Sequence, residues 1–222
     1  MRGDTVKILY EDRDIVVCVK PHGLSSEDGP SSMPAKLREY FASKQGKDAA
    51  QTEVYTVHRL DRDAGGLMVY ALNRKAAAAL SAQFGGRGVT KEYEALVSGE
   101  VTPDAARLTD YLFKDSSKNK VYAVKSPRKG VKEAALSYVV ADRDIYEGEP
   151  FTRVRVTLET GRTHQIRVQM ASRGWPVLGD RKYGSRVGLG FVALESVRLT
   201  FVHPAKGVEM TFEEPAAFEG IV

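Results

Sequence analysis

Apolar and polar positions in the first third of the chain alternate as they do in strands joined by charged turns. Residues 6–10 and the β-branched run 15–19 predict two paired strands. Residues 54–57 and 67–72 predict two more, on either side of the polar loop 58–66. A loop held between strands of a rigid sheet is a frequent position for catalytic groups. The pattern therefore makes residues 58–66 a candidate functional site.

Helical periodicity is weaker and confined to short segments. Pro34 begins a short predicted helix, and the polar stretch 43–53 after it predicts an exposed, mobile connection. Asn73 is the predicted N-cap of an alanine-rich helix over residues 74–84, because its side chain can accept a hydrogen bond from an amide of the first turn. The Gly85-Gly86 pair ends this helix.

The rest of the chain contains more strand patterns than helices. Thr163 is the predicted N-cap of a third helix, which ends at Arg173. Strand patterns cover residues 93–97, 111–113, 121–124, 134–140, 152–158, 199–202 and 208–212. This order of elements predicts a single α+β domain over residues 1–222, built on a mixed, mainly antiparallel β-sheet with flanking helices and loops.

The composition limits the class of protein. The chain has 33 basic and 29 acidic residues, which give a formal net charge of +4. Because this net charge is small, any binding of nucleic acid must come from local clusters of basic residues. The single cysteine, Cys18, lies in the apolar run 15–19, which predicts a small buried side chain and excludes a disulfide framework. No segment reaches the roughly 20 apolar residues that cross a membrane. We therefore expect a soluble, cytoplasmic protein.

The candidate loop carries a carboxylate beside arginines. Residues 58–63 read HRLDRD, and a second basic run, GRTHQIR, follows at residues 161–167. Asp61 is the candidate nucleophile or general base, because a carboxylate acts in either role only while it is ionised, and an arginine partner keeps it ionised. Arg167, in the second run, is the expected partner from across the fold. The alternative from the residues alone is a structural Asp–Arg pair.

Histidines accompany both basic runs. His58 and His164 are candidate acid–base groups or metal ligands, but no second histidine or cysteine stands at ligand spacing, which argues against a zinc site. A divalent ion held by His58, Asp61 and Asp63 in a hydrolase is a second alternative, which the neighbouring arginines oppose. The sequence therefore predicts no metal.

An aromatic residue and a lysine begin a later strand. Tyr93 alternates with Lys91, so its ring is a candidate surface for stacking a base extruded from RNA, while packing in the core is the ordinary alternative. The lysine-rich segment 114–132 is a candidate contact for the RNA backbone, against the default of a solvated face. Gly161 and Gly65-Gly66 match no phosphate-loop or dinucleotide fingerprint, so no nucleotide cofactor is predicted.

Taken together, these segments resemble the RluA-type family of RNA pseudouridine synthases from about Ile8 to Pro215. The resemblance lies in five blocks that occur in the family's order, and this joint order makes it specific. The blocks are Lys20-Pro21 with Gly23; His58-Arg59-Leu60-Asp61 with Gly66-Leu67; Lys91, Tyr93, Ala95 and Gly99; the run at 161–167; and Gly179-Asp180 with Tyr183-Gly184, followed by His203-Pro204.

The resemblance implies a reaction and a set of roles. Uridine in RNA is isomerised to pseudouridine, in which a C–C bond replaces the glycosidic C–N bond without cofactor or metal. Asp61 matches the catalytic aspartate, acting as a nucleophile on ribose C1′ or as a base at the 2′ position, and the sequence leaves both open. Arg167 matches the arginine paired with that aspartate. Tyr93 matches the tyrosine that stacks on the flipped uracil and helps remove the C5 proton. Arg59 matches the arginine that helps expel the base from the stack.

We expect the RNA contacts to come from the same segments. Besides Arg59, the candidate RNA-binding residues are Arg62, His58, Arg162, His164 and Lys91. Nothing before Val6 is long enough for the S4-like domain of some family members, so RNA choice is expected to rest on the catalytic domain, acting as a monomer. The expected substrate is a stem-loop of ribosomal or transfer RNA, because sequence-specific recognition favours unpaired, splayed bases.

One departure from the family pattern bears on activity. Ala64-Gly65 stands where many members carry threonine or serine before the glycine, so the hydrogen bonding of the Asp61 loop is expected to differ. This departure keeps open a further alternative, an RNA-binding module that retains the scaffold without catalysis.

Overall fold

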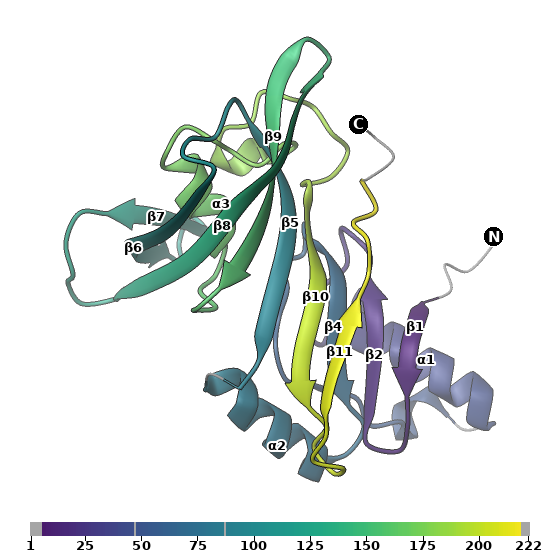
Figure 1. The fold of residues 1–222 in the computed structure, drawn as a ribbon. Helices are drawn as coiled ribbons and strands as arrows, with labels where there is room; N and C mark the ends of the chain where they lie inside the picture. Colours follow the sequence, from purple (N-terminus) through teal and green to yellow (C-terminus); the bar gives the residue numbers. More distant parts are fainter. Residues whose placement is uncertain (1–5, 47, 87, 219–222) are drawn as a thin grey trace. The chain divides into compact units, whose positions relative to one another are not determined.

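A computed structural model describes residues 6–46, 48–86 and 88–218 (Figure 1). The chain forms two compact units, each described here by itself. The first consists of Met1–Thr90 and Ser196–Glu214, and the second of Lys91–Glu195 and Pro215–Val222. A single catalytic domain over residues 1–222 stays a prediction.

The first unit is built on strands that pair in an antiparallel manner. Its strands are β1 (Lys7–Glu11), β2 (Ile15–Lys20), β3 (Tyr55–Thr56), β4 (Gly65–Ala71), β10 (Leu194–Val202) and β11 (Glu209–Glu213). β4 is central, because β2 pairs with it from Ile15 opposite Ala71 to Lys20 opposite Gly66, and β3 pairs with its last two residues, Tyr70 and Ala71. β1 extends the sheet beyond β2, and β11 pairs with β10. The predicted strands of this unit are present, with bounds shifted by one to five residues.

Helix α1 (Met33–Gln45) is longer than the sequence pattern predicts. Its N-cap is Ser32, whose hydroxyl accepts a hydrogen bond from Ala35 N at 3.2 Å, and the helix ends only at Gly46, where φ is 63°. A one-turn helix, η1 (Ala49–Gln51), follows it. The predicted exposed, mobile connection over residues 43–53 is therefore helical in its first residues, since no residue before the left-handed glycine stops the helix.

Helix α2 (Arg74–Gly85) confirms the predicted cap and covers the core of the first unit. Asn73 Oδ1 accepts a hydrogen bond from Ala76 N at 2.9 Å, as expected for an N-cap. Ala76 and Leu80 on the inner side of α2 pack against the apolar side chains of β2, β4 and β10. The buried members of this cluster are Ile15, Val17, Leu67, Val69, Ala71, Ala76, Leu80, Leu199 and Phe201.

The second unit contains five antiparallel strands in the order β5-β9-β8-β6-β7. Its elements are β5 (Thr90–Ser98), β6 (Ala105–Asp115), β7 (Lys120–Val124), β8 (Val131–Tyr146), β9 (Glu149–Leu158), α3 (Gln165–Ala171) and the one-turn helix η2 (Arg181–Tyr183). Val168 of α3 packs against Leu112, Val121 and Ala134 on one face of this sheet. The α+β class with a mainly antiparallel sheet is confirmed.

Helix α3 corrects the prediction for the run at 161–167. It begins at Gln165 rather than after a Thr163 cap, and it ends at Ala171 rather than Arg173. The residue before it, His164, has a left-handed φ of 51° and gives no side-chain cap. The Gln165 side chain holds this turn, because its Oε1 accepts hydrogen bonds from the Thr160 hydroxyl at 2.8 Å and from Arg162 N at 2.9 Å.

Two further expectations concern Cys18 and membrane-spanning segments. Cys18 is fully buried and burial raises the pKa of its thiol, which confirms the prediction of an inert apolar side chain. Among the helices of the described residues, none has the length and apolar character needed to cross a membrane.

Candidate active site

Asp61 lies in a tight turn immediately before β4. Its side chain is half-buried, and its carbonyl accepts a hydrogen bond from Ala64 N at 3.1 Å, which closes the turn. Leu60 before it and Ala64 after it are both buried, at 5% and 2% exposure. The turn is therefore closed by backbone atoms and anchored on each side by an apolar residue. Alanine at position 64 fits this arrangement, since the closing bond requires no side-chain hydroxyl.

Lys20 holds this turn through hydrogen bonds from its buried ammonium group. Only 1% of Lys20 is exposed, and its Nζ donates to the carbonyls of Pro21 at 2.9 Å, Leu24 at 2.9 Å and Arg62 at 3.3 Å. A buried charge is tolerated when hydrogen bonds of this kind replace its water. The lysine therefore ties the end of β2 and its following loop to the residue next to Asp61.

A second set of bonds joins the same two loops. Gly23 N donates to Arg62 O at 2.8 Å, and Arg62 Nε donates to Gly23 O at 2.7 Å. The Ser26 hydroxyl donates to Leu60 O at 2.7 Å and accepts from Leu60 N at 3.2 Å. The residue on each side of Asp61 is thus fixed by reciprocal hydrogen bonds, which restricts the direction in which the carboxylate points.

Gly66 allows β4 to start directly after the turn. Its φ is +102°, and a Cβ at this position would lie 2.3 Å from the backbone oxygen of Ser196. No side chain fits there without moving the backbone of β10. The glycine therefore lets two strands approach closely beneath the Asp61 turn.

His58 has a structural environment in this loop. Its Nε2 accepts a hydrogen bond from Val69 N at 3.1 Å, and its ring stacks on Phe84 with centroids 4.2 Å apart. An acceptor at Nε2 places the proton of the neutral ring on Nδ1. These contacts tie the loop to β4 and α2, and a direct contact of His58 with RNA stays a prediction.

Arg59 is an exposed cation two residues before Asp61. Its guanidinium lies 3.0 Å from Glu27, and both side chains are at least half exposed. An ion pair this exposed contributes little to stability, so Arg59 can leave Glu27 at low cost. Arg62, in contrast, has its Nε committed to the Gly23 carbonyl.

Tyr93 and Lys91 lie on β5 in the second unit and share one face of the strand, as residues two apart do. Tyr93 is 6% exposed. Burial lowers the pKa of Lys91. Its Nζ would lie 3.4 Å from a Cβ at Gly161, so the absence of a side chain there leaves room for the ammonium group.

Arg167 on α3 forms a buried bidentate ion pair with Asp180. Its Nε donates to Oδ2 at 2.6 Å and its Nη2 to Oδ1 at 2.9 Å, and the two side chains are 2% and 1% exposed. Paired, parallel hydrogen bonds of this kind fix the plane of the guanidinium as well as its charge. The sequence analysis missed Asp180 as a partner, although an acidic residue at the end of the apolar stretch 175–179 is a usable signal for a buried, paired charge.

Tyr183 covers the same guanidinium. Arg167 Cζ lies 5.3 Å from the centre of the Tyr183 ring. The Tyr183 hydroxyl accepts from Val121 N at 3.0 Å and lies 2.7 Å from His164 Nδ1. The candidate RNA-binding residue His164 is therefore held by Tyr183, and Arg167 is held on two sides.

Arg162 lies at the exposed end of the GRTHQIR run. Its Nε donates to the Glu133 carbonyl at 2.9 Å, and its backbone amide is fixed by Gln165. Gln165 is itself buried, and its Nε2 donates to Ala135 O at 3.0 Å on β8. The sheet therefore holds the backbone on which the arginine side chain is displayed.

The predicted catalytic residues divide between the two units. Asp61 belongs to the first unit, while Tyr93 and Arg167 belong to the second. Within the second unit the structure brings together Arg167, Asp180 and Tyr183, and within the first unit it brings Asp61 together with the residues that hold its turn. The pairing of Asp61 with Arg167 stays a prediction.

Comparison with known proteins decides the family. The model of the family described as RNA pseudouridylate synthase matches residues 14–172, which include the Asp61 loop, Tyr93 and Arg167. This chain belongs to that family. The RluA-type resemblance is confirmed by the Escherichia coli (strain K12) dual-specificity RNA pseudouridine synthase RluA, 37% identical over 95% of this chain and 93% of its own length.

Other members of the family are similar over almost the whole chain. An uncharacterized RNA pseudouridine synthase of Aquifex aeolicus (strain VF5) is 37% identical over 97% of this chain and 72% of its own length. The ribosomal large subunit pseudouridine synthase D of Vibrio cholerae is 35% identical, over 95% of this chain and 67% of its own. The solved structure of human RNA pseudouridylate synthase domain containing 1 superposes with a TM-score of 0.78 at 25% identity, over 97% of this chain and 86% of that one.

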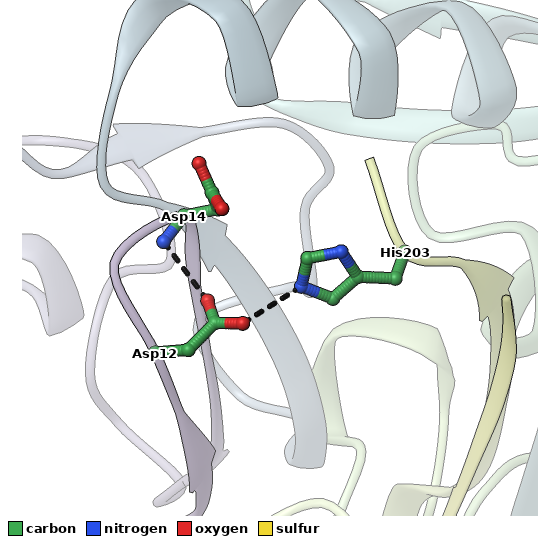
Figure 2. Close-up of side chains that lie close together, drawn as sticks. All are labelled: Asp12, Asp14 and His203. Carbon is green, nitrogen blue, oxygen red and sulfur yellow. Dashed lines mark hydrogen bonds and ion pairs between the residues drawn. The ribbon is translucent and has the colours of Figure 1, made fainter. Parts of the chain in front are cut away.

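One group of residues in this pseudouridine synthase has the composition of a metal site. Asp12, Asp14 and His203 offer ligand atoms within 4.8 Å of one another (Figure 2). His203 Nδ1 accepts hydrogen bonds from the amides of Ala205 at 3.2 Å and Lys206 at 3.0 Å, so Nε2 carries the proton and lies 2.9 Å from Asp12 Oδ2. A nitrogen that donates a proton cannot also bind a cation.

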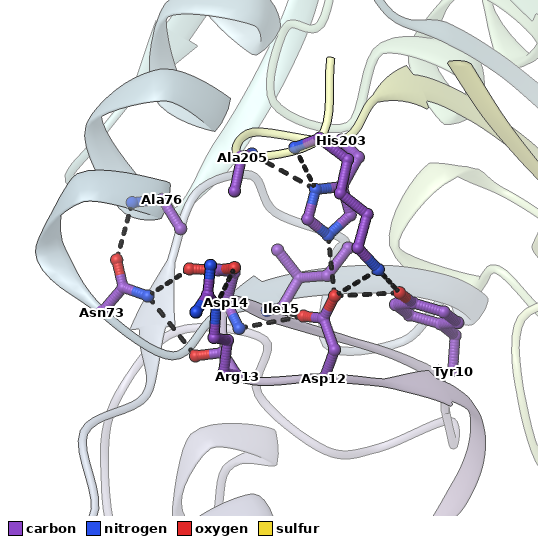
Figure 3. Close-up of polar contacts among 10 residues, drawn as sticks. Tyr10, Asp12, Arg13, Asp14, Ile15, Asn73, Ala76, His203 and Ala205 are labelled. Atoms are coloured by element: carbon purple, nitrogen blue, oxygen red, sulfur yellow. Dashed lines mark hydrogen bonds and ion pairs between the residues drawn. The ribbon is translucent and has the colours of Figure 1, made fainter. Parts of the chain in front are cut away.

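The carboxylates of Asp12 and Asp14 already accept hydrogen bonds from neighbouring protein groups (Figure 3). Asp12 accepts from the amides of Asp14 and Ile15 and from Lys206 Nζ, and Asp14 Oδ1 accepts from Asn73 Nδ2 at 2.9 Å. The group therefore joins the β1–β2 turn to the His203 turn and to the start of α2. We interpret it as structural, and its residues do not fit a resident metal ion.

Proposed function

We propose that this chain isomerises uridine to pseudouridine in structured ribosomal or transfer RNA, with Asp61 as the catalytic carboxylate. The observation that carries the proposal is a braced, half-buried aspartate in the HRLD loop of a chain that belongs to the RNA pseudouridylate synthase family. Among the relatives named above, the ribosomal large subunit enzyme supports ribosomal RNA as a substrate, and the dual-specificity enzyme supports action on more than one RNA.

The reaction moves a bond within one molecule. The N1–C1′ bond breaks, a C5–C1′ bond forms, and the C5 hydrogen leaves as a proton while N1 gains one, so the atoms balance without a cofactor. Asp61 serves either as a nucleophile on C1′ or as a base at C2′, and both roles require an ionised carboxylate. The fixed turn supports either role, because it restricts the carboxylate to a narrow range of directions.

Tyr93 and Arg167 complete the proposed machinery. The Tyr93 ring is the proposed stacking surface for an everted uracil, and base–aromatic stacking contributes about 1–3 kcal/mol per base. Arg167 is the proposed counter-ion of the Asp61 carboxylate. Its pairing with Asp180 supports this role in one respect, since a guanidinium fixed by a buried carboxylate presents its remaining N–H groups in one direction.

RNA reaches this machinery through base flipping. A target base must leave the stack before chemistry on its ribose and C5 positions can occur. Arg59, exposed and held only by a surface ion pair, is free to enter the space that the base vacates. The remaining candidate RNA contacts are Arg62, His58, Arg162, His164 and Lys91.

Among these contacts, Lys91 carries the clearest electrostatic argument. Burial lowers its pKa in the free protein, so an approaching phosphate or ribose oxygen that accepts from its ammonium group relieves an existing cost. We further propose that the enzyme acts as a monomer in the cytoplasm, on an RNA stem-loop whose unpaired bases are accessible.

The proposal is tested by release of tritium from RNA labelled at uridine C5. Transcripts of ribosomal and transfer RNA are incubated with the full chain, with Asp61→Asn and with Asp63→Asn as a control in the same turn. The full chain and Asp63→Asn are expected to release tritium, whereas Asp61→Asn is expected to release none and to bind RNA normally. Equal release by Asp61→Asn would falsify the assigned role, and RNA binding with no release by any variant would favour the non-catalytic alternative.

A further inference from the structure

Basic charge is concentrated in one short part of the chain. Residues 114–132 contain seven basic residues and one acidic residue, a net charge of +6, whereas the whole chain has +4, so all other residues together carry −2. The seven are Lys114, Lys118, Lys120, Lys125, Arg128, Lys129 and Lys132. We call residues 114–132, which comprise the end of β6, β7 and the start of β8, the basic hairpin. Within the described part of the chain, none of its seven cations forms an ion pair.

The two faces of the basic hairpin differ. One face carries Leu112 and Val121 and is buried against α3. On the opposite face, Phe113 of β6 lies directly across from Tyr122 of β7, and 37% of Tyr122 is exposed. Residues on adjacent strands in this register have their side chains next to each other. This face therefore carries two neighbouring aromatic rings, next to Asp115 and Lys120 on the same strands.

Cations lie over both rings. Lys120 Nζ is 5.8 Å from the centre of the Tyr122 ring, and Arg128 Cζ is 5.3 Å from that of Phe113. Aromatic faces combined with unpaired cations are the arrangement with which proteins hold single-stranded nucleic acid, through base stacking and phosphate contacts.

The basic hairpin is continuous with the proposed catalytic residues of the same unit. Lys120 Nζ lies 5.5 Å from the centre of the Tyr183 ring, and Arg167 Cζ lies 5.3 Å from the same centre. Val121 N bonds to the Tyr183 hydroxyl along the outer edge of β7, the last strand of the sheet. One tyrosine thus separates the hairpin from Arg167.

We propose that the basic hairpin binds the substrate RNA outside the target uridine, with Tyr122 stacking an unpaired base and the lysines contacting phosphates. The identity of this RNA as a substrate rests on the function proposed above. RNA fits better than an acidic protein, because the exposed aromatic face offers a stacking surface that carboxylates do not use, and the cations flank it as phosphates would require.

Binding of an unmodified transcript of large-subunit ribosomal RNA tests the proposal. The full chain carries Asp61→Asn throughout, so that no turnover alters the RNA, and affinity is measured over a series of salt concentrations. Lys125→Ala and Lys129→Ala are each expected to lower the slope of log affinity against log salt by about 0.7–0.9. Lys75→Ala, an exposed lysine on α2, is the matched control and is expected to leave the slope unchanged.

The stacking contact has its own variants. Tyr122→Ala is expected to weaken binding by about 5- to 150-fold at every salt concentration, with no change of slope. Tyr122→Phe keeps the ring and is expected to bind as the parent does. Loss of affinity in both variants would indicate disturbed folding, which circular dichroism of each variant would detect, and normal affinity in both would remove the stacking role.

The outcomes separate this proposal from the catalytic one. If the lysine variants keep the parental slope, or if the parent shows no salt-dependent RNA binding, the basic hairpin does not bind RNA and an acidic protein becomes the better candidate partner. In that case, tritium release by the active chain would leave the proposed function standing. If the hairpin variants lose RNA binding but the active chain releases no tritium, the RNA surface stands and the catalytic proposal fails.

Discussion

Replacing Asp180 with asparagine changes one charge and almost no volume in the most deeply buried ion pair of the second unit. In the native protein both oxygens of Asp180 accept from Arg167, at 2.6 and 2.9 Å, and neither side chain exceeds 2% exposure. The asparagine amide keeps one acceptor but turns an NH₂ group toward the guanidinium. Arg167 then remains charged and buried, but it loses the carboxylate that accepts both of these hydrogen bonds.

The expected effect follows from that burial. Removing one partner of a buried ion pair costs about 3–5 kcal/mol, because the remaining charge cannot regain its water. A loss of this size is a large fraction of the 5–15 kcal/mol that typically separates folded from unfolded protein. The same substitution releases the guanidinium from its fixed plane, so the rate of the proposed reaction is expected to fall along with stability. The Arg167→Met variant is expected to behave similarly, since it leaves Asp180 uncompensated.

Urea unfolding of the two single variants and the double variant measures this coupling. The losses of unfolding free energy in Asp180→Asn and Arg167→Met are expected to add up to more than the loss in the double variant. The reason is that each single variant leaves one member of the ion pair without the other, whereas the double variant removes both. Glu159→Gln is the control, since it breaks the Arg107–Glu159 pair, whose side chains are 58% and 40% exposed. If Asp180→Asn unfolds at the same urea concentration as Glu159→Gln, the structural role assigned to the buried pair is wrong.

Three further substitutions probe the supports of the Asp61 turn and the first unit. Lys20→Met leaves carbonyl acceptors of the bracing loop unsatisfied and is expected to cost about 1–3 kcal/mol in urea unfolding, with slower tritium release because the Asp61 turn loosens. Gly66→Ala places a Cβ 2.3 Å from a Ser196 backbone atom, so it should lower the melting temperature sharply, whereas Gly85→Ala, with nothing within 4 Å, should not. Burial raises the pKa of Asp12, but backbone and side-chain hydrogen bonds outweigh it and lower the pKa well below 3.8. The ionised Asp12 carboxylate therefore contributes its full stabilisation above pH 3.8 and less of it below that pH. The Asp12→Asn variant is expected to lose about 1.5–3 kcal/mol of unfolding free energy at pH 7, measured in urea, and a smaller amount at pH 2.5. An equal loss at both pH values would contradict the role assigned to the Asp12 carboxylate.

Local rules in the sequence determined a large part of the secondary structure. The alternation around the β1–β2 turn, the Asn73 cap of α2 and the apolar setting of Cys18 each depend on neighbouring residues, and each appears in the structure as predicted. The order of sequence blocks also determined the family, because that order is a property of the chain alone. The end of α1 and the start of α3 were less predictable, since a left-handed residue sets each boundary and neither Gly46 nor His164 belongs to the hydrophobic pattern.

Tertiary structure alone decided which polar groups meet. Asp180 is 13 residues from Arg167, and Lys20 is 42 residues from Arg62, so nothing in the local sequence specifies either contact. A buried charge must find a partner or hydrogen bonds wherever the fold places it, and the fold supplies them from distant segments. The same reason explains the basic hairpin, in which the sequence shows the lysines and only the strand register places Phe113 beside Tyr122. The local sequence thus determines the helices, the strands and the candidate catalytic side chains. Tertiary packing determines which residues hold those side chains in place.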